Sequence, residues 1–289
     1  MSQTYTPSGK FSIFSILLFL ILAFLVFPLL GYIYALCLVN IPFVYINFLL
    51  SWGFGMSIGF LLSKVVISFG KVRNKRLELI FGILGGFIAL YFHWAIWLTL
   101  IMQSSFSTES VGSSSTSFNF SLFQSIVTHP VELFKTVTEI NGIGTWGIKS
   151  STIKGGFLWF IWAVEFLGIM FFAITATNGA ELPFCEVTNK WFKRKTISPM
   201  AFIKDKDAFL ASIENSDYSY FEALEKGDKA FDHSSLFLYN SEMGENYLTV
   251  VNHILKVNSK GESEFEDDNV VFQVNINDNL VNIIDNKSN

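Results

Sequence analysis

The chain has 289 residues, of which 51% are hydrophobic and only 15% charged, with a mean hydropathy of +0.44. Soluble domains usually carry about 25% charged residues, so this composition indicates segments embedded in a lipid bilayer. Residues 1–179 carry nine Lys and Arg against five Asp and Glu (net +4), whereas residues 180–289 carry eleven against nineteen (net −8). The acidic tail argues against nucleic-acid binding, which requires a basic surface.

Four apolar segments predict four membrane spans. Each is close to the ~20 residues that an α-helix needs to cross a bilayer. The first segment is too long for a cleaved signal peptide, whose apolar region has about 7–15 residues. The predicted spans are 12–34, 43–68, 77–102 and 157–178. We therefore expect residues 1–179 to form a membrane α-helical bundle of about four transmembrane helices.

Lys and Arg mark the cytoplasmic ends of spans. The basic loop 71–76 and the basic set 190–195 are separated by two spans, so they share a side, and Lys10 falls on that side too. We expect both termini to be cytoplasmic and loop 103–156 to lie outside. Abundant Asn, Lys, Ile and Phe suggest an AT-rich genome, so a bacterial inner (plasma) membrane is the expected location, with an organelle or endomembrane as the alternative.

The outer loop has two parts. Residues 104–117 are rich in Ser and Thr, which predicts a flexible segment. Thr128-His129-Pro130 predicts the start of a helix, because proline suits the first helical turn, and Asn141-Gly142 predicts its end. Val131, Phe134, Val137 and Ile140 recur at helical spacing. We expect this amphipathic helix to lie on the bundle or at the outer membrane interface, with the surface of a small outer subdomain as the alternative.

After the fourth span we expect a juxtamembrane connector, 180–200, and then a cytoplasmic α+β soluble domain, 201–289. Hydrophobic patterning predicts helices first and then strands. The acidic residues between Glu262 and Asp268 are interpreted as a solvated turn. The predicted helices are 205–214 and 217–226, and the predicted strands are 236–239, 247–257, 270–276 and 280–284.

Small residues recur every four positions in the second and third spans. Such residues let helix backbones approach closely, and this drives helix association inside a bilayer. We interpret them as helix-packing faces and expect a tight contact that involves both spans. They are Ser51, Gly55 and Gly59 in the second span and Gly82 and Gly86 in the third.

Glu165 lies inside the fourth span and His93 inside the third. A charge in mid-membrane costs about 2.5–3.5 kcal/mol on insertion scales, so such residues face protein or a cavity. Both lie at a similar distance from the outer ends of their spans, so they could form a hydrogen-bonded or ionic pair. The pair is either a proton or ion relay, or a polar tie that fixes helix packing.

Sequence signatures of catalysis, nucleotide binding and metal binding are absent. Cys185-Glu186-Val187-Thr188 resembles half of a zinc-ribbon knuckle, but Thr188 stands where the second cysteine ligand would be needed. We expect no metal site, no catalytic residue and no cofactor. The two cysteines, Cys37 and Cys185, imply no disulfide framework.

These observations favour a non-enzymatic membrane anchor or scaffold that presents a cytoplasmic interaction domain. Its expected partners are the bilayer and a protein, either another membrane subunit or a soluble protein. The alternative is a small transporter or ion-coupled membrane subunit that uses Glu165 and His93.

Overall fold

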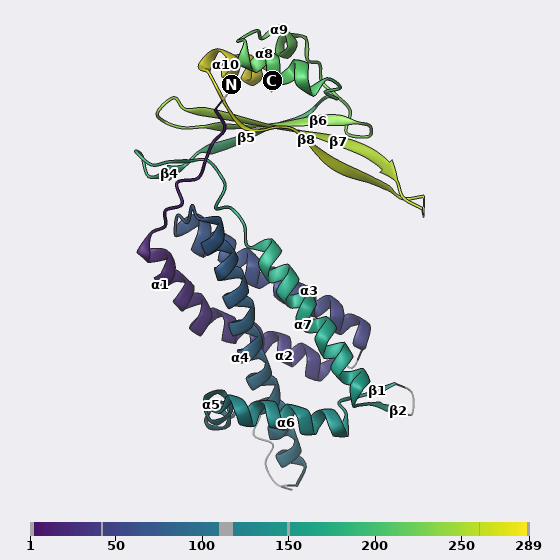
Figure 1. Cartoon of the computed structure of the whole chain (residues 1–289). Coiled ribbons are helices and arrows are strands. Elements are labelled where there is room, and N and C mark those ends of the chain that lie inside the picture. Colours follow the sequence, from purple (N-terminus) through teal and green to yellow (C-terminus); the bar gives the residue numbers. More distant parts are fainter. Residues whose placement is uncertain (1–2, 42, 110–117, 149–150, 260, 288–289) are drawn as a thin grey trace. The chain divides into compact units, whose positions relative to one another are not determined.

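The computed structural model describes residues 3–41, 43–109, 118–148, 151–259 and 261–287 (Figure 1). It divides into two compact units. The first is helical and comprises Gly9–Ala180, and the second combines Met1–Ser8 with Glu181–Asn289. The chain therefore leaves the second unit after its first few residues and returns to it after the last long helix.

The helical unit contains four helices that are long and apolar enough to cross a membrane, namely Ile13–Asn40, Tyr45–Phe69, Lys75–Gln103 and Gly156–Ala176. The first is divided into α1 (Ile13–Ile21), a π-helical turn (Leu22–Val26) and α2 (Phe27–Asn40). Its π-turn precedes Pro28, which cannot donate a helical hydrogen bond. The others are α3 (Val44–Leu61) with a π-segment (Leu62–Phe69), α4 (Lys75–Glu109) and α7 (Gly156–Ala176).

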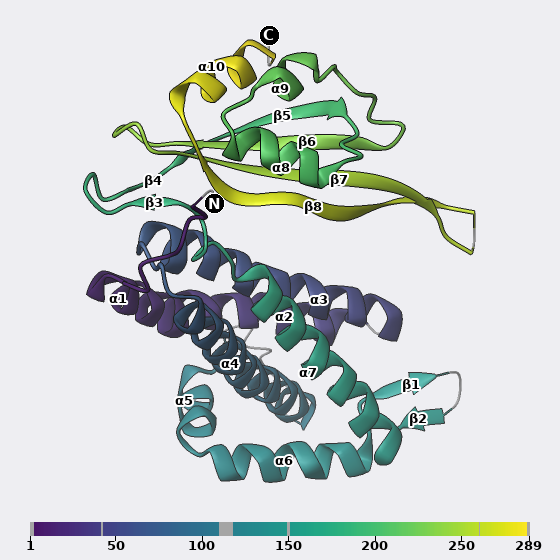
Figure 2. The ribbon, with the colours of Figure 1, turned by 45° about the horizontal axis from the view of Figure 1, so that its top comes forward.

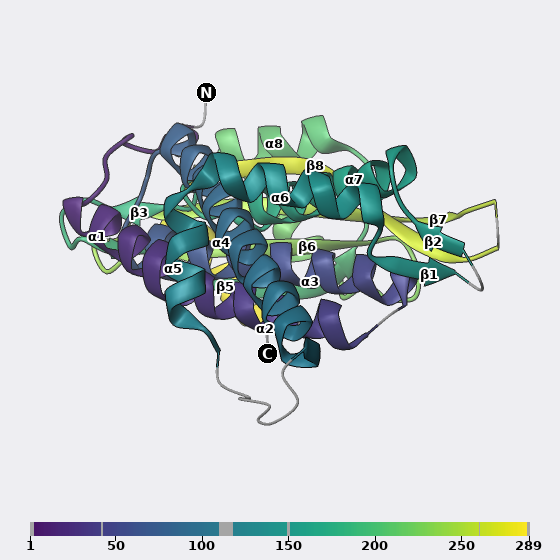
Figure 3. The same cartoon turned by 90° about the horizontal axis from the view of Figure 1, so that it is seen from below.

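The segment between α4 and α7 forms α5 (Phe120–Thr128), α6 (Pro130–Ile143) and a hairpin of β1 (Trp146–Ile148) and β2 (Ser151–Ile153). The two helices lie across one end of the long helices (Figures 1 and 3). The predicted start at Pro130 is confirmed, but α6 continues past Asn141-Gly142 and ends before Gly144, which has a φ of +97°. The predicted apolar stripe is partly wrong, because Leu133 and Val137 are buried whereas Val131 and Phe134 are exposed.

The predicted flexible segment 104–117 begins inside α4, which reaches Glu109; the rest of that segment, residues 110–117, lies outside the described residues.

The second unit contains a four-stranded antiparallel sheet in the order β5-β6-β7-β8. Helices α8, α9 and α10 cover one face of it (Figure 2). Its core contains Phe209 and Phe221 from the helices and Leu238, Leu248 and Val250 from the sheet. The strands are β3 (Phe184–Cys185), β4 (Lys190–Trp191), β5 (Lys193–Ala201), β6 (His233–Asn240), β7 (Asn246–Val257) and β8 (Ser263–Ile276), and the helices are α8 (Lys206–Glu214), α9 (Ser219–Ala223) and α10 (Asp278–Lys287).

The predicted α+β class agrees with this unit, but three local predictions are wrong. Residues 180–200 are not a connector, because they contain β3, β4 and most of β5. Charged side chains at the start of β5 belong to an edge strand, where charge blocks unwanted strand pairing. The predicted strand 280–284 is part of α10, and Glu264–Asp268 lie within β8 rather than in a turn.

The N-terminal residues add a short strand to the edge of β8, which the sequence did not predict. Thr4 forms a β-bridge with Val274. The Tyr5 N–H donates to the Gln273 carbonyl at 2.8 Å, and the Asn275 N–H donates to the Gln3 carbonyl at 2.8 Å. Both ends of the chain are thus built into the same unit.

Candidate functional site

Five of the buried polar side chains in the described part of the helical unit come from the four long helices, and each of these helices contributes at least one. All are at most 7% exposed. They are Tyr34 of α2, Asn47 and Ser51 of α3, His93 of α4 and Glu165 of α7. Burying a polar group without a hydrogen-bond partner costs free energy of folding. Polar residues inside membrane spans often mark functional sites, so this cluster is the candidate site of the bundle.

Close packing of α3 on α7 fixes the positions of Asn47, Ser51 and Glu165 along the helix axes. A Cβ added to Gly55 would lie 2.6 Å from the Ile169 carbonyl oxygen, and one added to Gly59 would lie 2.6 Å from that of Ala173. The two helices are therefore parallel with a constant offset. The same offset places Ser51 level with Glu165, and Asn47 one turn earlier on the same face of α3.

The third span also packs on α7 through its small residues. A Cβ on Gly82 would meet Ile174, and one on Gly86 would meet Met170. The small-residue faces of the second and third spans therefore both contact the fourth span, rather than only each other.

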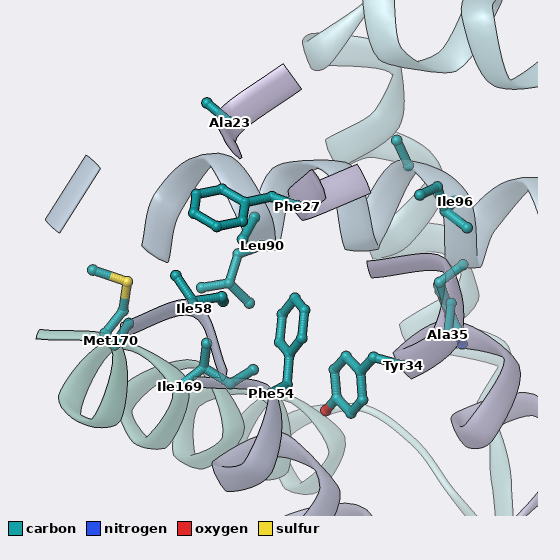
Figure 4. Close-up of a cluster of buried hydrophobic side chains, with 14 of the residues drawn as sticks. Ala23, Phe27, Tyr34, Ala35, Phe54, Ile58, Leu90, Ile96, Ile169 and Met170 are labelled. Carbon is teal, nitrogen blue, oxygen red and sulfur yellow. The ribbon is translucent and has the colours of Figure 1, made fainter. Parts of the chain in front are cut away.

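Close packing of α2 on α4 positions His93. A Cβ on Gly31 would lie 3.2 Å from the His93 Cα, and the His93 Nδ1 lies 3.4 Å from the Gly31 carbonyl oxygen. The imidazole stacks against the ring of Tyr34 with a centroid distance of 4.4 Å. Tyr34 also stacks on Phe54 of α3 at 4.8 Å (Figure 4).

Tyr34 interacts with both of the residues that the sequence singled out. Its ring contacts His93, and its hydroxyl interacts electrostatically with Glu165. The hydroxyl also interacts with the Ser51 side chain, whose own hydroxyl donates to the Phe48 carbonyl at 2.8 Å. A tyrosine within an apolar segment carries no distinguishing sequence signal, and it was therefore missed.

Glu165 and His93 lie in the same cluster but are not directly bonded. Within the described part of the chain, Glu165 Oε1 has no hydrogen-bond partner, and His93 approaches the Gly31 carbonyl instead. The Asn47 amide oxygen and nitrogen are also unpartnered there, although Asn47 is fully buried. Buried groups of this kind call for a specific explanation such as a proton, a water molecule or an ion.

A second polar chain lies in the other unit, on four neighbouring strands. His253 Nε2 lies 2.8 Å from Ser235 Oγ, and His253 Nδ1 lies 2.6 Å from Asp267 Oδ1. Ser235 Oγ is in turn 2.8 Å from Ser198 Oγ of β5. These residues are far apart in sequence and match no short motif, so only the strand register brings them together.

The zinc-knuckle-like segment forms the β3–β4 hairpin. Thr188, which stands at the second ligand position, hydrogen-bonds Cys185 and lowers the pKa of its thiol. Across residues 3–41, 43–109, 118–148, 151–259 and 261–287, three or more His, Cys, Asp or Glu side chains are nowhere grouped so as to hold a metal ion. The chain matches no model of a known protein family, no curated protein and no solved structure.

Proposed function

We propose that this chain is a multi-pass membrane protein whose helical bundle anchors a soluble unit that binds a protein partner. The outward side chains of the bundle support insertion in a bilayer. Leu25, Leu49, Phe60 and Leu167 are 58–71% exposed. Such an apolar surface is unfavourable in water but suits hydrocarbon.

The observation that carries the proposal is the N-terminal strand on β8. Residues 3–5 and the last hundred residues belong to one sheet-containing unit, so an even number of spans must separate them. This agrees with four spans. The basic residues Lys71, Arg73, Lys75 and Arg76 lie between the second and third spans, on the same side as both termini. The positive-inside bias then puts the second unit in the cytoplasm, in a bacterial cell beneath the inner membrane.

The second unit suits partner binding because it is stably built and strongly charged. It has its own hydrophobic core, and residues 180–289 carry a net charge of −8. A surface potential of this sign accelerates association with a basic partner.

Affinity purification from the native membrane in a gentle detergent tests the proposal. The full chain should retain a stoichiometric partner, and a chain truncated after Ala180 should lose it. The cut belongs there because the helical unit ends at Ala180 and the residues that follow belong to the other unit. A full chain that carries no partner, or a partner retained by the truncated bundle, would contradict the proposal.

A second candidate function is proton-coupled transport, which the buried groups without partners favour. Glu165 Oε1 and the Asn47 amide have no hydrogen-bond partner among the described residues, and Glu165 interacts with the Tyr34 hydroxyl. Chains of Asp, Glu and His form proton relays in membrane pumps and transporters. Glu165→Gln keeps the shape of the side chain but removes its titration.

Under the anchor proposal, Glu165→Gln leaves partner binding and cellular function intact. Under the transport candidate, function is lost although the folded protein accumulates to normal levels. Glu132→Gln on the exposed face of α6 is the matched control, and it should have no effect in either case.

A further inference from the structure

The Ser235–His253–Asp267 chain has the geometry of a nucleophile, a general base and an orienting acid. In such triads the hydroxyl and the carboxylate bind opposite nitrogens of one imidazole at hydrogen-bond distance. Both distances here, 2.8 Å to Ser235 and 2.6 Å to Asp267, meet that requirement. Triads recur on unrelated folds and in any chain order, so geometry rather than sequence identifies them.

From this arrangement we infer that Ser235 is an activated nucleophile that attacks a small carboxylic ester. This goes beyond the proposed anchoring function. The three residues sit on adjacent paired strands, with His253 opposite both His233 on β6 and Asp267 on β8. Ser235 is two residues along β6 from His233, which is the diagonal position that a long side chain reaches across a sheet. Regular strands hold such groups more precisely than loops do.

The carboxylate of Asp267 selects the imidazole tautomer. Because a carboxylate only accepts hydrogen bonds, His253 Nδ1 donates to it, and Nε2 is left as the acceptor facing Ser235 Oγ. His253 can then take the Ser235 proton as Oγ bonds to the carbonyl carbon of the ester. The same proton returns to the departing alkoxide when the ester bond breaks, which leaves an acyl-Ser235 that water hydrolyses by the same route.

Ser198 contacts Ser235 and is also one of the residues that line a pocket. A pocket of about 280 Å³ is lined by Ser198 and its neighbours in β5, together with Lys226, Gly227 and Lys287. The Ser235 hydroxyl donates to Ser198 Oγ at 2.8 Å, so its proton turns from Ser198 to His253 Nε2 before attack. Ser198 is therefore a positioning residue, which holds Ser235 Oγ in place.

A fluorophosphonate–biotin probe, which forms a stable adduct with activated serines, tests the inference on the full chain in mild detergent. Mass spectrometry of the digested protein should place the adduct on Ser235, and heat-denatured protein should not react. Ser235→Ala should abolish labelling. His253→Gln should slow it by about 10²–10⁴-fold, the usual contribution of a general base.

His233→Gln is the matched control. His233 stacks on His253 at 4.8 Å, but its Nδ1 bonds the Phe231 carbonyl and not Ser235. Its replacement should leave the labelling rate within about twofold, since it removes no base. Asp267→Asn should slow labelling and change its pH profile, an effect that a purely structural role would not produce.

An adduct absent from native protein, or mapped to Ser198 or to scattered residues, would overturn the inference. Equal slowing by His233→Gln and His253→Gln would also overturn it. If Ser235→Ala does not fold, the adduct site mapped on the unaltered chain decides the question alone.

Discussion

Among single residues, Tyr34 interacts with the largest number of other members of the buried cluster, and its hydroxyl can be removed without changing the ring. Tyr34→Phe removes the interactions of the hydroxyl with Ser51 and Glu165 and keeps the ring against His93 and Phe54. The Ser51 hydroxyl still donates to the Phe48 carbonyl, so the substitution leaves the Ser51 donor with an acceptor. We expect a loss of about 0.5–1.5 kcal/mol in unfolding free energy in detergent. Tyr32→Phe is the control, and equal stability of the two variants would contradict the assigned interactions.

A second prediction for single residues concerns the Lys190–Glu242 pair in the acidic unit. The Lys190 ammonium donates to both Glu242 oxygens at 2.9 Å and lowers the pKa of that carboxyl. The charged form is thus favoured in the folded state. The pair's stabilisation is present above the unfolded value of about 4.3 and is lost as pH falls through the lowered folded value.

An NMR titration of Glu242 should show a midpoint below that ordinary value, and Lys190→Gln should move the midpoint back toward it. An ordinary midpoint in the unaltered chain would show that the pair does not persist in solution.

Among the elements, α3 packs closely on α7 through Gly55. A methyl group on Gly55 would lie 2.6 Å from the Ile169 carbonyl oxygen. Because that oxygen belongs to the backbone of α7, the two helices would have to move apart. Gly55→Ala should therefore cost about 1–3 kcal/mol of stability. Gly53→Ala is the matched control on the same helix, where a Cβ meets nothing within 4 Å. It should be neutral or stabilise by up to about 1 kcal/mol. Equal effects on thermal unfolding would refute the contact.

Element prediction from sequence succeeded where hydrophobicity dominates and failed where tertiary context decides. Long apolar runs predict the four long helices, because a span needs a fixed length. The region 280–284 looked strand-like, yet Leu280, Val281 and Ile284 are buried on one face of α10 and Asn277 caps its first turn. This short apolar run fits both the 3.6-residue repeat of a helix and the two-residue repeat of a strand, so only its packing on the sheet distinguishes the two structures.

Site prediction was limited for a similar reason. Glu165 and His93 could be selected because titratable residues are rare inside spans. Tyr34 and Asn47 join them only through the helix register, which small residues permit but do not specify. The Ser235–His253–Asp267 chain depends on the pairing of three strands, and its members are individually ordinary.

For the whole molecule, we propose that both chain ends lie on the cytoplasmic side of a four-span bundle. The N-terminal strand on β8 requires a shared side. The positive-inside bias selects which side it is, and α6 then lies outside.

Cysteine accessibility in intact cells tests this most directly. In a Cys37→Ser/Cys185→Ser background, a membrane-impermeant maleimide should label Glu139→Cys in α6. It should not label Gln3→Cys or Lys229→Cys until the cells are opened, and all three positions belong to the described, exposed surface. Labelling of position 3 and position 229 in intact cells would reverse the orientation, and labelling of only one of them would contradict the shared unit and the four-span bundle.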